Sequence, residues 1–314
     1  MNKNMTESAA QLAATLSSLQ SLYNKATKDN TRKAYQHDIA RFLASGAPLP
    51  CQEADVLKYI TQVCQHLNPK TLQRHLLSVK HWHITQGLPD PTANPQVKQA
   101  LKGALNTYAQ PVLKAEAMTE KGLHQVVDFL LTQKNKRSIR DRALFLTGFY
   151  GACRRSELAR FHWEDLQFVN EGLILRFRHA KGDRQQCGER CSIPAGKVVN
   201  HCPIQALLDW QRASGYHQGP VFREIFKNDR VGEKGIQGQQ VNRMIQKRAQ
   251  QVNLPNAGKI SAHSLRRGFA TEAFRKGASL NHIKRHGRWK SLKTVLEYLE
   301  DARLFVDSPV SVFF

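Results

Sequence analysis

The feature that most constrains the fold of this chain is the helical spacing of apolar residues between breakers over residues 6 to 110. Apolar side chains recur every three or four positions in successive stretches, which is typical of amphipathic helices. Asn30 or Thr31 is the expected cap of the stretch NTRKAYQHDIARFLASG. The stretches are separated by turn signals: Gly46, Asn68-Pro69 and GLPDPTANP at residues 87 to 95. This half of the chain therefore predicts a small helical bundle.

The residues after the polar joint TYAQPVLKAEAM have a mixed pattern. The segment GLILRFRHAKGDRQQCGERCSIP is typical of two strands around a Lys-Gly-Asp turn. Gly277 is expected to close one helix, and Ser279 and Ser291 to cap the next two. Helices are predicted at residues 119 to 133, 139 to 151, 203 to 214, 238 to 252, 264 to 276, 279 to 286 and 291 to 300.

We therefore expect a mainly α protein with a small antiparallel β-sheet in its second domain. At 314 residues the chain is long enough for two domains that each bury a core. The predicted division is an N-terminal extension at residues 1 to 20, a helical domain at 21 to 110, a linker at 111 to 117 and a second domain at 118 to 314.

The charge of the chain points to a polyanionic partner. The 47 Lys and Arg residues outnumber 25 Asp and Glu residues, which gives a formal net charge of +22. Both halves carry part of this excess, so both are candidates to contact the partner. A ribosomal or merely soluble basic protein has a similar composition, and only a functional site distinguishes these classes.

The sequence offers no sign of a membrane or of a metal site. No stretch approaches the roughly 18 consecutive apolar residues of a membrane span, and the first twenty residues lack the pattern of a secretory signal. We expect a cytoplasmic protein whose six cysteines are reduced. Cys187, Cys191, His201 and Cys202 are candidate zinc ligands, but their spacing is poor for a tetrahedral site.

Four features of the second half suggest one chemistry. Arg154 and Arg155 precede Ser156, a plausible helix cap; His263 and Arg266 are three apart in HSLRR; Lys181 falls at the tip of the predicted hairpin; and Tyr298 follows Trp289 by nine residues. Cations also crowd just before this tyrosine, at Lys284, Arg285, His286, Arg288 and Lys290.

These residue types suit phosphodiester transfer without a metal ion. A planar guanidinium holds the nonbridging phosphate oxygens bidentately and does not lose its proton. A mobile lysine can protonate a leaving 5′ oxygen, and a histidine can exchange a proton with the attacking group. A tyrosine hydroxyl, with an ordinary pKa near 10, becomes a useful nucleophile when such cations surround it.

The motifs R-x-S-E-L at residues 154 to 158, H-S-L-R at 263 to 266 and W-x8-Y at 289 to 298 resemble the signature of the tyrosine recombinases, also called the phage integrase family. The stretch NTRKAYQHDIARFLA resembles their core-binding helices, and the tryptophan makes the chain similar to Cre-like members. The resemblance implies a two-domain C-shaped DNA clamp. It also implies a site-specific recombinase that works as a homotetramer through a 3′-phosphotyrosine and a Holliday junction, without metal, ATP or another cofactor.

The family pattern also assigns roles. Arg154 and Arg266 would clamp the phosphate, Tyr298 would be the nucleophile, Lys181 the general acid and His263 the proton-handling residue. Trp289 would contact the phosphate, and Glu157 would support the site. His286 offers a shifted alternative to Trp289, and Arg178 and Arg184 lie near enough to Lys181 to leave the hairpin register open.

Further residues are candidates for DNA contact by the same resemblance. They are Arg32, Lys33, Lys70, Arg74, His75 and Lys80 in the first half, and Arg155 and Arg267, as DNA-backbone or structural contacts, in the second. A charged helix face is usually only solvated. The apolar end of the chain is expected to pack on its own domain or to dock on a neighbouring protomer. A telomere resolvase, a type IB topoisomerase and a non-cleaving DNA-binding regulator remain alternative functions.

Overall fold

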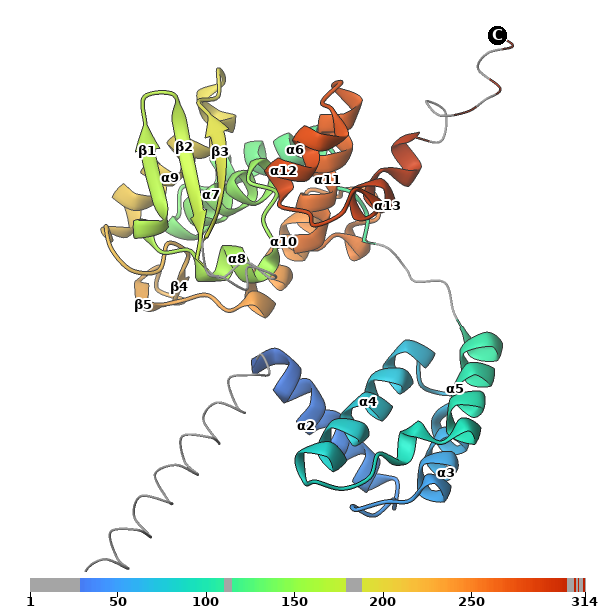
Figure 1. Ribbon diagram of the computed structural model, residues 1–314. Coiled ribbons are helices and arrows are strands. Elements are labelled where there is room, and N and C mark those ends of the chain that lie inside the picture. The colour runs from blue at the N-terminus through green and yellow to red at the C-terminus, as the bar shows by residue number, and fades with distance from the viewer. Residues whose placement is uncertain are drawn as a thin grey trace, which may run out of the picture. The chain divides into compact units, whose positions relative to one another are not determined.

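The computed structural model describes residues 29–109, 115–178 and 188–303, with residues 308, 310 and 313. The chain divides into two compact units between residues 113 and 114. The described part of the first unit is helical, and the second combines helices with two small antiparallel sheets, as Figure 1 shows. This confirms the predicted fold class. The expected N-terminal extension, Lys181 and most of the C-terminal tail lie outside the described residues.

The first unit is a bundle of short helices around one core. A helix opens at the Asn68-Pro69 turn signal: the side chain of Asn68 accepts a hydrogen bond from the Lys70 amide at 3.0 Å, and Pro69 takes the first helical position. Asn30 and Thr31 are not caps, because the helix already includes Asp29. The elements are α2 (Asp29–Ala44), α3 (Glu53–Val63), α4 (Pro69–Thr85), η1 (Pro91–Ala93) and α5 (Pro95–Tyr108). The core residues include Phe42, Val56, Leu72, Val79 and Val97.

The second unit is built around α7, most of whose residues are buried. Helices α6, α9 and α11 pack against it. No helix in the described ranges is long and apolar enough to cross a membrane. The helices are α6 (Glu120–Thr132), α7 (Lys136–Tyr150), α8 (Arg155–Arg160), α9 (Pro203–Ser214), α10 (Gly238–Gln251), α11 (Ala262–Arg275), α12 (Leu280–Gly287) and α13 (Leu292–Arg303), with 3-10 turns η2 (Trp163–Asp165), η3 (Val199–His201) and η4 (Ala257–Lys259).

The larger sheet contains the two predicted strands and one more. Strands β1 (Leu166–Val169), β2 (Gly172–Phe177) and β3 (Glu189–Pro194) pair antiparallel in that order. Gly172 has a φ of +154°, and a Cβ there would lie 2.2 Å from a β3 carbonyl oxygen, so the turn into β2 requires glycine. The second sheet is a hairpin of β4 (Arg223–Ile225) and β5 (Val231–Gly235). Strands β1, β4 and β5 are too short to leave a clear period in the sequence.

Helices α11, α12 and α13 pack against one another in the second unit (Figure 1). Gly277 follows α11 in the left-handed region, at a φ of +85°. The side chain of Ser279 accepts a hydrogen bond from the amide of His282, and Ser291 accepts one from Thr294. The predicted helix ends are therefore confirmed, and they fix the short connections that carry Trp289 and Tyr298.

Candidate active site

Tyr298 and His263 meet at the contact between α13 and α11. The tyrosine hydroxyl lies 2.8 Å from Nε2 of His263, and the two ring centroids are 5.2 Å apart. The imidazole of His263 is accessible but partly buried. This burial is the main cause that lowers its pKa below the ordinary value, and the positive charges of Arg266, Arg267 and Arg154 add to it. The imidazole is therefore neutral at pH 7, and its Nε2 can accept the phenolic proton.

Trp289 lies between Tyr298 and Arg266. Its ring centroid is 5.6 Å from that of Tyr298, and the guanidinium carbon of Arg266 lies 4.1 Å from the centre of the indole. The indole Nε1 is buried and has no hydrogen-bond partner among the described residues. An unpaired buried donor is costly, so this N–H is suited to a ligand that supplies an acceptor.

Arg266 is 1% exposed, and its Nη1 donates to the carbonyl oxygen of Ala152. Burial, then the nearby charges of Arg154 and Arg288, lowers the pKa of Arg266 to about 10. The guanidinium thus keeps its charge at neutral pH although little solvent surrounds it. Such a desolvated cation interacts strongly with an anion.

Arg154 lies immediately before α8 and is tied to Glu157. Its backbone N–H donates to Oε2 of Glu157 at 2.8 Å, and its Nη1 to Oε1 at 2.5 Å. Because this carboxylate pairs with the backbone of Arg154, α8 begins at Arg155, and Ser156 is inside the helix and not its predicted cap. The side chain of Arg154 remains 24% exposed, so it can reach a ligand from solvent.

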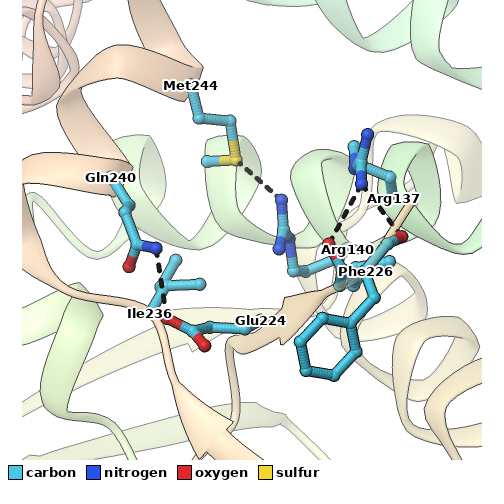
Figure 2. Close-up of a pocket in the computed structure, with 8 residues that line it drawn as sticks. Arg137, Arg140, Glu224, Phe226, Ile236, Gln240 and Met244 are labelled. Carbon is cyan, nitrogen blue, oxygen red and sulfur yellow. Dashed lines mark hydrogen bonds between the residues drawn. The ribbon is translucent and has the colours of Figure 1, made fainter. Parts of the chain in front are cut away.

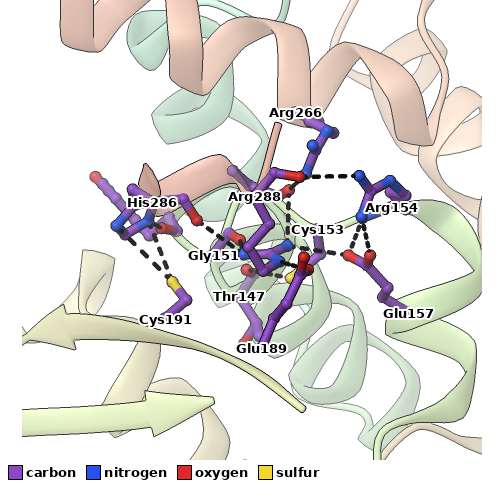
Figure 3. A network of polar contacts seen from close by, with 12 residues as sticks. Thr147, Gly151, Cys153, Arg154, Glu157, Glu189, Cys191, Arg266, His286 and Arg288 are labelled. Carbon is purple, nitrogen blue, oxygen red and sulfur yellow. Dashed lines mark hydrogen bonds and ion pairs between the residues drawn. The ribbon is translucent and has the colours of Figure 1, made fainter. Parts of the chain in front are cut away.

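Arg288 joins the two arginines to the loop before α8, and its place was not predicted. Its sequence position places it among the cations before Tyr298, yet its side chain is 2% exposed and points into a polar network (Figure 3). Arg288 has a φ of +56°, a conformation rare for this residue type. Its guanidinium contacts Glu157, the carbonyls of Gly151, Ala152 and His286, and the ring of Phe177.

Glu157 is the anion that balances this cluster. Burial alone would raise its pKa, but Arg288 and Arg154 outweigh that effect and hold the pKa below the ordinary value. The carboxylate is therefore ionised at neutral pH and accepts from both side chains, at 3.0 Å from Arg288. Glu157 and Arg288 therefore form a hydrogen-bonded network that fixes the surroundings of Arg154 and Arg266.

The other predicted site residues have different surroundings. Lys181 and Arg184 lie outside the described residues, and Arg178 pairs with Asp165. His286 stacks on Phe269 and shares a 2.7 Å hydrogen bond with the Tyr150 carbonyl. The residues weighed for zinc have other contacts where they are described: Cys191 with His286, His201 with Asp128, and Cys202 with the Gly196 amide. The described residues contain no group suited to a metal ion.

The residues predicted to contact DNA differ in exposure. Arg155, Lys33 and Lys70 are exposed, whereas Arg267 is buried and donates to the Ala115 carbonyl at 2.9 Å. His75 is 1% exposed, so its predicted place on a DNA-facing surface is wrong. The remaining three form ion pairs: Arg32 with Asp29, Lys80 with Asp90 and Arg74 with Asp38.

A separate hollow lies between α7, α10 and the β4–β5 hairpin (Figure 2). It measures about 300 Å³, and its two arginines already have partners: Arg137 donates to backbone carbonyls of the hairpin, and Arg140 donates to the Arg223 carbonyl and to Asp141. Tyr298, His263, Trp289, Arg266 and Arg154 do not line this hollow. We therefore place the candidate site at Tyr298.

Gly287→Ala is expected to destabilise the second unit. A Cβ at this position would lie 1.7 Å from the Trp289 ring, which is itself fixed against Arg266. Overpacking of this kind costs about 1–3 kcal/mol of the free energy of unfolding. Urea unfolding would measure the change. Gly258→Ala is the control, because nothing lies within 4 Å of a Cβ there; equal stability of the two variants would contradict the packing seen here.

Comparison with known proteins identifies a family. The model of the phage integrase family matches residues 116–303. The integrase/recombinase XerD homolog of Selenomonas ruminantium is 30% identical over 301 residues, which cover 91% of this chain and 86% of that protein. The recombinase Cre of Escherichia phage P1 is 21% identical over 271 residues, covering 80% and 77%.

Solved structures show the same fold. The Tn1549 transposon integrase, determined in complex with transposon right end DNA, matches with a TM-score of 0.62 and 16% identity, over 92% of this chain and 96% of that one. A lambda integrase dimer bound to a COC′ core site matches with a TM-score of 0.62 and 13% identity, over 95% and 81%. With the family model matched across most of the second unit, this chain belongs to the phage integrase family, the tyrosine recombinases.

Proposed function

We propose that this protein is a site-specific DNA recombinase that cuts and rejoins strands through a 3′-phosphotyrosine at Tyr298. The observation that carries the proposal is the Tyr298 hydroxyl at 2.8 Å from a neutral His263, next to Trp289 and Arg266. A nucleophile, a base and anion-binding groups thus converge.

In the proposed step, the Tyr298 oxygen attacks the phosphorus and passes its proton to His263. The bond from phosphorus to the 5′ oxygen breaks, and Lys181 supplies the proton to that oxygen. Arg154, Arg266 and the indole N–H of Trp289 hold the nonbridging oxygens, and their charge and orientation favour the transition state. One phosphodiester replaces another, so the 5′ hydroxyl of a partner strand can reverse the step without ATP. No step requires a metal ion.

Double-stranded DNA is the proposed partner of both units. The net charge of +22 supports this, as do the integrases of similar fold whose complexes contain DNA. We infer that residues 21 to 110 act as a core-binding domain and residues 118 to 314 as the catalytic domain, joined by the linker at 111 to 117. Binding to chromosomal DNA would place the protein in the cytoplasm with the nucleoid.

We further propose that four protomers act on two sites and pass through a Holliday junction. Each protomer would exchange one strand. The apolar end of the chain, most of it outside the described residues, would dock on a neighbouring protomer. Burial of an apolar segment of this kind would favour assembly on DNA.

Covalent trapping tests the proposal. The protein is incubated with fragments of the DNA that flank its own gene, in EDTA, and adducts that survive SDS are resolved by electrophoresis. An adduct supports tyrosine chemistry without a metal ion. A regulator that does not cleave would leave none on any DNA it binds. A resolvase or topoisomerase would form the adduct but would not exchange strands between two separate sites, which a two-site recombination assay measures.

Adduct formation is expected to fall at acid pH because His263 must be neutral to accept the tyrosine proton. Its pKa lies below the ordinary histidine value of about 6.5, so protonation, and with it the loss of rate, begins only below that pH. The rate at subsaturating DNA reports on the free protein. His263→Asn should be slow throughout and lack this acid limb. If both proteins lose rate in the same way at acid pH, His263 does not accept the tyrosine proton.

A further inference from the structure

A buried carboxylate orients one exposed arginine in the first unit. Asp38 on α2 has a fully buried side chain, and the side chain of Arg74 on α4 is 46% exposed. Nε of Arg74 donates to one Asp38 oxygen at 2.8 Å, and Nη2 donates to the other at 2.7 Å. This bidentate geometry fixes the plane of the guanidinium.

The carboxylate is itself held from several sides. The Ser78 hydroxyl donates to it at 3.0 Å, and Nε2 of His75 lies 3.2 Å away. Burial would raise the pKa of Asp38, but the hydrogen bonds from Arg74 and Ser78 and the nearby charges outweigh it and lower the pKa. Asp38 is therefore ionised at neutral pH, and its partner Arg74 is the member of the pair that reaches the solvent.

The fixed guanidinium keeps donors for a ligand. A guanidinium has five N–H groups, and the two bonds to Asp38 use Nε and one hydrogen of Nη2. The end formed by Nη1 and Nη2 is not used by this pair. That end has the spacing of the O6 and N7 acceptors of guanine in the major groove, which an α-helix can enter.

Helix α4 carries exposed apolar side chains as well as Arg74. Leu77 lies one turn further along α4 and is 50% exposed, and Ile84 on the same helix is 55% exposed. An apolar side chain beside a base-reading arginine can contact a thymine methyl group. The lysines of this unit present an ammonium and not a planar fork: Lys33 and Lys70 are exposed, and Lys80 pairs with Asp90 at 3.1 Å. Their geometry suits phosphates, which carry no sequence information.

We propose that Arg74 reads a guanine of the target site and that Asp38 is the positioning residue that aims it. This inference rests on the proposed function, because it needs DNA as the partner. It adds to that function the determinant of sequence preference: α4 lies in the major groove, and the Asp38–Arg74 pair distinguishes G·C from other base pairs at one position.

The test compares the DNA sequences selected by full-length variants, all carrying Tyr298→Phe so that cleavage does not distort the selection. The parent protein selects from a randomised duplex library, and each position of the enriched site is then substituted singly. Arg74→Ala should lose the preference for one guanine, a change of about 5- to 150-fold at that position, and keep the others. Lys70→Ala is the matched control and should weaken binding to all sequences about equally.

Asp38→Asn should weaken the preference at the same base pair, because the guanidinium loses its charged anchor. In an Arg74→Ala background the Asp38 substitution should have no further effect on that preference, which a merely structural role does not predict. Circular dichroism and thermal melting establish that each variant is folded. If Asp38→Asn does not fold, Arg74→Gln decides the point, since a side-chain amide matches the N6 and N7 of adenine and must lose the preference for guanine.

Two outcomes overturn the inference. If Arg74→Ala weakens binding to all DNA sequences by the same factor, Arg74 contacts a phosphate and does not read a base. If the parent selects no sequence, recognition of DNA fails as a whole. Adduct formation by the unmodified protein is measured in parallel and distinguishes the two levels: an adduct without the Arg74 effect refutes only this inference, whereas neither adduct nor selected site refutes the proposed function.

Discussion

Tyr298→Phe is expected to abolish the SDS-resistant adduct and leave DNA binding in place. The substitution removes the only oxygen of the side chain that can attack phosphorus, and it keeps the ring that packs 5.6 Å from Trp289. The lost hydrogen bond to His263 lies near the surface, so no buried group is left unpaired. Adduct formation by electrophoresis and affinity by equilibrium binding, on the same DNA, separate chemistry from recognition.

Tyr216→Phe is the matched control. This tyrosine belongs to the same unit, outside the site, and its ring contacts Arg223 at 3.7 Å, a contact that phenylalanine retains. The control should form the adduct at the normal rate. An adduct that persists in Tyr298→Phe would place the nucleophile on another residue, and loss in both variants would point to a general effect on folding.

Local sequence signals predicted where several helices begin, including those that carry the site. Asn68-Pro69 begins α4, and Ser279 and Ser291 cap α12 and α13, because capping depends on residues within one helical turn. The three-residue spacing of His263 and Arg266 placed both on α11. Helix propensity and caps act over a few positions and can be read directly from the chain.

Contacts between distant residues could not be predicted in this way. Asp38 and Arg74 are separated by 36 positions, and nothing local marks either as a partner. The interpretation of His75 as a surface residue failed because charge patterning does not reveal which face of α4 is buried. Arg288 was read as one of several cations near Tyr298, whereas its left-handed backbone turns the side chain toward Glu157, 131 positions away.

The network around Glu157 explains why so many arginines can lie together. Arg154, Arg266 and Arg288 would repel one another in the low dielectric of the protein, and two carboxylates, Glu157 and, 3.9 Å from Arg288, Glu189, do not neutralise all three. The backbone carbonyls of Gly151 and Ala152 supply further acceptors. A residual positive potential therefore remains in the cluster, which is the property needed to attract a phosphodiester.

Arg154→Ala is expected to slow adduct formation by at least about 10²- to 10³-fold, the loss typical of one transition-state donor, while DNA affinity changes little. Arg154 is a better test than Arg266, which is 1% exposed and packed on Trp289, so that its removal would disturb the fold. When Arg154 is removed, Glu157 keeps its 3.0 Å bond to Arg288, and the hydrogen-bonded network should survive.

Arg155→Ala controls for the loss of one positive charge, since it alters the next residue, which is exposed on α8. It should reduce affinity slightly and leave the rate of adduct formation on saturating DNA unchanged. The rate is measured in a single turnover, so that release of product does not mask the chemical step. Equal rates for the two variants would remove Arg154 from the site. A large loss only in Arg154→Ala would establish that the side chain acts on the reacting phosphate and not through overall charge.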